Sequence, residues 1–132
     1  MKDLAYKNAS ELIRGYKTGR FSPLEVLDAV LARVDECEGR LNAWRLIDRR
    51  RARRRAQASA ARWTKGAPCG LLDGVPTAIK DVTETKDWPT LNGSLAINAS
   101  GPWPVDAIVV ERLKAHGAVI LGKTETPEYA WR

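Results

Sequence analysis

The sequence predicts an α/β fold in which N-terminal helices precede part of a mixed, largely parallel sheet. Residues 1–66 carry apolar residues at helical spacing behind recognisable helix caps. Residues 67–132 change to apolar strands separated by turns and one helix. A strand, a crossover helix and a second strand favour parallel pairing, and the small number of strands predicts an incomplete sheet.

Two capped helices open the chain. Asn8, with a glutamate three residues later, forms a capping-box pattern, and the first helix is expected to end near Gly19. Ser22, followed by Pro23 and a second such glutamate, starts the next helix, which Gly39 is placed to end. The apolar stripes of both helices predict a packing role.

A strongly basic helix comes after a short candidate strand at residues 43–47. From Arg45 to Lys65, nine basic residues stand against one acid, although the formal net charge of the whole chain is only +6. Apolar side chains at helical spacing predict one packed face, with arginines around the rest of the helix. These apolar residues are Ala52, Ala56, Ala60 and Trp63.

A basic helix of this kind can hold phosphate groups. However, no aromatic residues alternate with the arginines, and no groove-reading motif accompanies them. We therefore interpret the arginines as a solvated face and expect no nucleic-acid partner.

The second half alternates strands, a loop and a helix. Residues 75–80 are typical of a buried strand, and residues 87–103 of a long loop interrupted by prolines and glycines. Asp106 is expected to cap a helix that Gly117 ends, and residues 119–121 are expected to form the next strand.

One motif in this half is misleading. Residues 117–124, Gly-Ala-Val-Ile-Leu-Gly-Lys-Thr, match the phosphate-loop pattern. A phosphate loop needs a strand before its first glycine and a helix that starts at its lysine, whereas here the apolar strand lies inside the motif and Pro127 follows it. We therefore expect no nucleotide site. His116, the only histidine, is interpreted as a solvated helix end, and nothing in the sequence predicts a metal site.

A lone lysine, Lys80, stands in the apolar segment Gly70-Leu-Leu-Asp-Gly-Val-Pro-Thr-Ala-Ile-Lys-Asp81. Three further segments follow in order. They are Thr90-Leu-Asn-Gly-Ser94, Asp106-Ala-Ile-Val-Val-Glu-Arg-Leu-Lys-Ala-His-Gly-Ala118 and Val119-Ile-Leu-Gly-Lys-Thr-Glu-Thr-Pro-Glu-Tyr-Ala-Trp131. Together the four segments resemble the amidase signature family, serine hydrolases that cleave carboxamide C–N bonds. The chain departs from the usual family residues at Leu71, His116 and Glu125, and none of these is the lysine.

The resemblance implies a mechanism and a domain organisation. Lys80 corresponds to the general base, and the nucleophilic serine and the serine that bridges it to the lysine are not in this chain. Residues 1–132 would then be the N-terminal fragment of a single amidase signature domain, with a helical part at 1–66 and a strand-helix-strand part carrying the lysine at 67–132. The resemblance implies a small-molecule amide substrate and no cofactor, and it allows a homo-oligomer of the complete enzyme. The fragment alone is predicted to be inactive.

Three alternatives to a simple amidase fragment stay open. They are a non-catalytic binding module, one half of a split amidase, and part of a subunit of a tRNA-dependent amidotransferase. Asp81, Thr90 and Ser94 are expected to be structural residues that position the loop after Lys80, because no motif places a base beside Ser94.

The expected location is the cytoplasm, without membrane contact. No apolar run is long enough for a signal peptide or a membrane span. Cys37 and Cys69 are too few for a disulfide framework and have no metal-binding spacing, so we expect reduced thiols.

Overall fold

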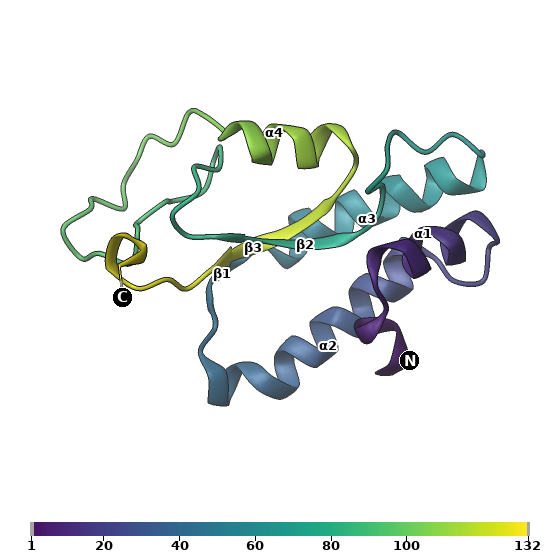
Figure 1. Cartoon of the computed structure of the whole chain (residues 1–132), viewed down its shortest axis with the longest axis horizontal. Coiled ribbons are helices and arrows are strands. Elements are labelled where there is room, and N and C mark those ends of the chain that lie inside the picture. Colours follow the sequence, from purple (N-terminus) through teal and green to yellow (C-terminus); the bar gives the residue numbers. More distant parts are fainter. Residues whose placement is uncertain (1, 132) are drawn as a thin grey trace.

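The computed structural model describes residues 2–131 and has a mixed α/β architecture around one three-stranded sheet (Figure 1). In chain order the elements are η1 (Lys2–Tyr6), α1 (Ala9–Lys17), α2 (Pro23–Leu41), β1 (Trp44–Ile47), α3 (Arg49–Thr64), β2 (Pro76–Lys80), α4 (Ile108–Ala115), β3 (Val119–Thr124) and η2 (Glu128–Ala130). The predicted fold class is confirmed, including the strand expected at residues 43–47.

The last strand in the sequence lies in the middle of the sheet. The order is β1-β3-β2, with β3 parallel to β2 and antiparallel to β1. The parallel pair is joined through α4, as the strand-helix-strand pattern predicts. β3 continues beyond the expected residues 119–121 to Thr124. Gly122 permits the close approach of β1, because a Cβ atom at this position would lie 1.9 Å from the carbonyl oxygen of Leu46.

Apolar side chains of β3 serve two cores, one on each face of the sheet. Val119 and Leu121 pack with α2 and α3, whereas Ile120 packs with α4. The first core consists of Leu27, Leu31, Ala52, Ala56, Val119 and Leu121, and the second of Ile79, Trp88, Val110 and Ile120. Figure 1 shows α4 on one side of the strands and α1 and α2 on the other. Successive strand residues face opposite sides, so an uninterrupted apolar run suits a strand covered on both faces.

The helix starts follow the sequence prediction, but one helix end differs. Both capping boxes form, with the side chains of Asn8 and Ser22 as caps. The prediction that Gly39 ends α2 is wrong, because the helix continues to Leu41. Asn42 ends it in a left-handed conformation with φ of 48°, which asparagine tolerates. The Glu38 carboxylate accepts hydrogen bonds from the next two backbone N–H groups, at 3.2 and 3.0 Å, and so fixes this end.

The predicted cap of α4 is also wrong. The N-cap residue is Ala107, which has no side-chain capping bond. Asp106 instead accepts a 2.7 Å hydrogen bond from the Lys86 N–H and pairs with Lys114 from the last turn of α4. Burial opposes ionisation of Asp106, but the bonds from Lys114 and from the Lys86 N–H outweigh it and hold the pKa of this carboxyl below its ordinary value.

A buried ion pair attaches the end of α3 to the turn before β2. Arg62 donates two hydrogen bonds to Asp73, at 2.8 and 2.6 Å, and Asp73 is 0% exposed. The indole of Trp63 adds a 3.0 Å bond to the Asp73 carbonyl. Of the predicted packing face of α3, the first two alanines are fully buried, whereas Ala60 and Trp63 are half-buried.

The Asp73 carboxylate should make stability depend on pH in acid. Burial opposes its ionisation, but the hydrogen bonds from Arg62 and from the Cys69 N–H outweigh burial and lower its pKa from the ordinary 3.8. The unfolded chain therefore binds more protons in acid, so this contribution to stability is complete above about pH 5 and decreases as the pH falls through the lower, folded-state pKa. The difference in free energy of unfolding between the wild type and Asp73→Asn, from urea titrations, should shrink between about pH 5 and pH 2. A difference that does not change with pH would contradict this.

Candidate active site

Lys80 lies at the carboxyl end of β2, an edge strand. Along β2, Ile79 is buried in the core under α4, whereas Ala78 and Lys80 are exposed. Because successive side chains of a strand point to opposite faces, Lys80 faces away from α4. The side chain expected from the resemblance to act as a base is therefore open to solvent.

The backbone next to Lys80 is held on both sides. The carbonyl of Lys80 accepts a 3.0 Å hydrogen bond from the Thr83 N–H, which closes a turn. Asp81 donates its N–H to the Thr124 carbonyl at 3.0 Å, and its own carbonyl accepts from the Asn92 N–H at 3.0 Å. An exposed side chain thus rises from a fixed main chain.

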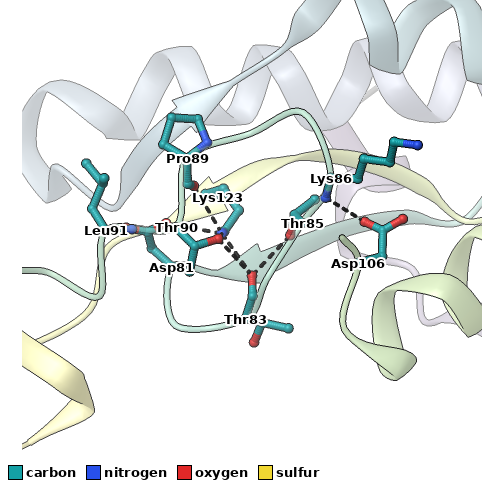
Figure 2. Close-up of polar contacts among 9 residues, drawn as sticks. All are labelled: Asp81, Thr83, Thr85, Lys86, Pro89, Thr90, Leu91, Asp106 and Lys123. Carbon is teal, nitrogen blue, oxygen red and sulfur yellow. Dashed lines mark hydrogen bonds and ion pairs between the residues drawn. The ribbon is translucent and has the colours of Figure 1, made fainter. Parts of the chain in front are cut away.

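A second lysine, Lys123 of β3, is buried on the other face of the sheet. Its ammonium donates to the Thr83 carbonyl at 2.9 Å, the Thr90 hydroxyl at 2.7 Å and the Pro89 carbonyl at 3.3 Å (Figure 2). The Asp81 carboxylate lies 3.2 Å from the same nitrogen. Lys123 and Asp81 are 0% and 1% exposed. These contacts join β3 to the loop that follows Lys80.

Burial lowers the pKa of Lys123, and the neighbouring Asp81 carboxylate partly offsets this by favouring the ammonium. A lysine with a lowered pKa is a candidate base on chemical grounds. Here, however, the three donors of the ammonium match three acceptors, and the side chain has no exposed surface. We therefore assign Lys123 a structural role, which leaves Lys80 as the accessible amine of the two.

The sequence analysis missed Lys123 because it considered this residue only as part of the phosphate-loop pattern. That pattern has no phosphate-loop geometry here, since residues 119–124 are strand and no helix begins at the lysine. A usable signal existed. Lys123 interrupts an apolar strand just as Lys80 does, and a lysine in such a strand needs either solvent or buried partners.

The other polar residues expected to be structural have mainly structural contacts. The Ser94 hydroxyl donates to the Glu128 carboxylate at 2.6 Å and accepts from the Ala96 N–H at 3.3 Å. His116 is exposed at the end of α4, where its Nδ1 accepts from the Leu71 N–H at 3.3 Å. Thr90 and Asp81 both belong to the Lys123 cluster described above.

Intramolecular ion pairs use several arginines of α3. Arg49, Arg51, Arg53 and Arg62 pair with Asp35, Asp87, Asp28 and Asp73. Arg51 also stacks over the ring of Trp88, with 5.3 Å from its guanidinium carbon to the ring centroid. Much of the positive charge therefore ties α3 to α2 and to the loops, and does not form an open patch.

Nucleic-acid binding by α3 should consequently be weak. In a gel-shift titration, duplex DNA or RNA should dissociate steeply with rising salt, because only phosphate contacts would form. Replacing the exposed Arg50 and Arg54 by alanine should weaken the binding of all sequences alike. Binding that selects a sequence and survives high salt would contradict this expectation.

Comparisons with known proteins agree with the fold and the motifs. The family model described as Amidase matches residues 25–131. The A subunit of the glutamyl-tRNA(Gln) amidotransferase from Anaeromyxobacter sp. (strain K) is 41% identical over 129 residues, which are 98% of this chain and 26% of that protein. In the part of the chain that the structure describes, no helix is both long and apolar enough to cross a membrane.

Solved structures give the same result. A bacterial aryl acylamidase of the amidase signature enzymes family matches with a TM-score of 0.88 and 27% identity, over 96% of this chain and 26% of that one. Native peptide amidase from Stenotrophomonas maltophilia matches with a TM-score of 0.86 and 29% identity, over 98% of this chain and 26% of that one. The chain thus spans about a quarter of the length of the proteins it matches.

Proposed function

Because this chain belongs to the amidase signature family, we propose that it is the N-terminal part of an enzyme that hydrolyses carboxamide C–N bonds, with Lys80 as the general base. The observation that carries this proposal is the position of Lys80. It is an exposed amine on a strand end whose main chain is fixed by hydrogen bonds. A base needs both an accessible nitrogen and a defined direction.

The proposed chemistry assigns one role to this chain and others to serines outside it. A neutral lysine takes a proton from a bridging serine, which in turn takes one from the nucleophilic serine. The nucleophile attacks the amide carbonyl, backbone N–H groups stabilise the oxyanion, and the amine departs with a proton. Water then cleaves the acyl-enzyme and releases the acid.

The lysine must lose its proton before it can act. A lysine in water is charged at neutral pH, whereas burial beside hydroxyl groups disfavours the ammonium. Lys80 is exposed in residues 2–131. We infer that a further segment, which carries the serines, covers this face of β2 and creates the environment in which Lys80 becomes a base.

The 132-residue chain alone should therefore release no ammonia from simple carboxamides. Purified wild-type chain and Lys80→Ala should give the same background rate in an ammonia-release assay. If the wild type shows hydrolysis that the variant lacks, a hydroxyl within residues 1–132 is acting as the nucleophile, and the assignment of the serines to another segment is wrong.

A second candidate function is that of one component of a tRNA-dependent amidotransferase. The 41% identity to the glutamyl-tRNA(Gln) amidotransferase relative exceeds the 27% and 29% identities to the aryl acylamidase and the peptide amidase, at similar coverage of the chain. Such a component would hydrolyse glutamine and pass ammonia to a partner. The substrates of the full-length gene product separate the two. Glutamine hydrolysis that rises when partner proteins are added supports the amidotransferase, and broad hydrolysis of simple amides without a partner supports the amidase.

A further inference from the structure

A buried ion pair lies directly beside the proposed base. We propose that Asp81 and Lys123 are positioning residues, which fix the main chain at Lys80 and thereby the direction of its side chain. This inference rests on the proposed function of Lys80. Neither residue can react with a substrate itself, since both are buried on the opposite side of the strand from the exposed Lys80 side chain.

Lys123 is connected to Lys80 through a single residue. The ammonium of Lys123 donates to the Thr83 carbonyl, and the Thr83 N–H donates to the Lys80 carbonyl. Figure 2 shows this ammonium between Asp81, Thr83, Pro89 and Thr90, with bonds to both ends of the 83–90 loop. A displacement of the ammonium would therefore release the turn that follows the base.

Asp81 holds the other side of the same turn. Its N–H and carbonyl bond to Thr124 and Asn92, and one carboxylate oxygen accepts from the Leu91 N–H at 3.2 Å. The second carboxylate oxygen faces the Lys123 ammonium. The residue that follows the base in the sequence thus has four groups held by four different residues.

Energetics favour positioning over stabilisation as the reason for this pair. A buried ion pair loses solvation, and an apolar pair of similar volume often serves stability as well or better. An apolar pair, however, would leave the Thr83 and Pro89 carbonyls of an irregular loop without this donor. The ion pair therefore specifies where the loop lies, and Lys80 stands at the start of that loop.

The chain supplies a matched control at the other end of β2. Arg62 and Asp73 form an ion pair whose carboxylate is equally buried, but it holds the turn before the strand and not the turn after Lys80. Removing either pair removes one buried carboxylate and one cation. Only removal of the Asp81 pair should disturb Lys80.

The test compares Asp81→Asn/Lys123→Met with Asp73→Asn/Arg62→Met in the full-length gene product. By hydrogen exchange, the Thr83 and Asn92 N–H groups should exchange about tenfold faster in the first variant and near the wild-type rate in the second. The kcat for amide hydrolysis should fall about tenfold or more in the first variant, with KM within twofold. Equal effects of the two variants on Thr83 exchange, or on kcat, would overturn the proposal.

Two further outcomes are separated by the same measurements. If the wild type hydrolyses no amide, the proposed function fails, while the exchange rates still decide whether the pair holds the turn. If the first variant does not fold, the wild-type rate decides. Exchange of the Thr83 N–H as fast as in an unprotected loop would overturn the proposal, and strong protection would support it.

Discussion

Replacing Lys80 by alanine in the full-length gene product should lower kcat for amide hydrolysis by about 10²- to 10⁴-fold, the usual contribution of a general base. The fold should survive, because the side chain is exposed and its main-chain bonds do not depend on it. Ammonia release over a range of substrate concentrations gives kcat and KM, and an unchanged melting temperature confirms that the variant is folded.

Two further variants separate a base from a structural charge at this position. Lys80→Arg keeps the positive charge, but a guanidinium is not deprotonated in proteins, so this variant should be as inactive as the alanine variant. Lys86→Ala removes another exposed lysine from the loop that follows and should leave kcat unchanged. Retained activity in Lys80→Arg would mean that charge, and not proton transfer, is what the position supplies.

Replacing Lys123 alone by methionine should lower the free energy of unfolding by about 3–5 kcal/mol. Methionine fills a similar volume, but the Asp81 carboxylate is then buried without its cation, and the Thr83 carbonyl loses a charged donor. Urea denaturation of the wild type and the variant measures the loss.

A partly exposed pair provides the control for this loss. Lys114 and Asp106 also form an ion pair, but their side chains are 20% and 12% exposed, so water can solvate the carboxylate that remains. Lys114→Met should therefore cost clearly less than Lys123→Met. The double variant Asp81→Asn/Lys123→Met should also cost less than Lys123→Met alone, because no uncompensated charge remains. Equal losses in all three would contradict the burial argument.

Local sequence signals predicted the parts of the fold that depend on neighbouring residues. The capping boxes at Asn8 and Ser22 involve residues three positions apart, and both form. The predictions for Gly39 and Asp106 failed because contacts from elsewhere decide these positions. The carboxylate of Glu38 reaches past the end of α2, and Asp106 bonds to Lys86, which precedes it by a long loop.

The candidate site divides in the same way. Lys80 could be singled out from its own strand and from the motifs around it. The partners of Lys123 lie 33 to 40 residues away in the sequence, so no local pattern connects them. A buried ammonium is visible in the sequence only as a lysine within an apolar strand, and identification of its acceptors requires the path of the 83–90 loop.

The central place of β3 in the sheet also governs the order of events during synthesis. β1 and β2 do not touch each other, and each pairs only with β3. A ribosome adding about 5–20 residues per second makes β1 several seconds before β3. Throughout that interval the nascent chain carries two strands without partners, although its capped helices can already form. The sheet closes only after residue 124 has left the exit tunnel, so the strand made last brings the first two together.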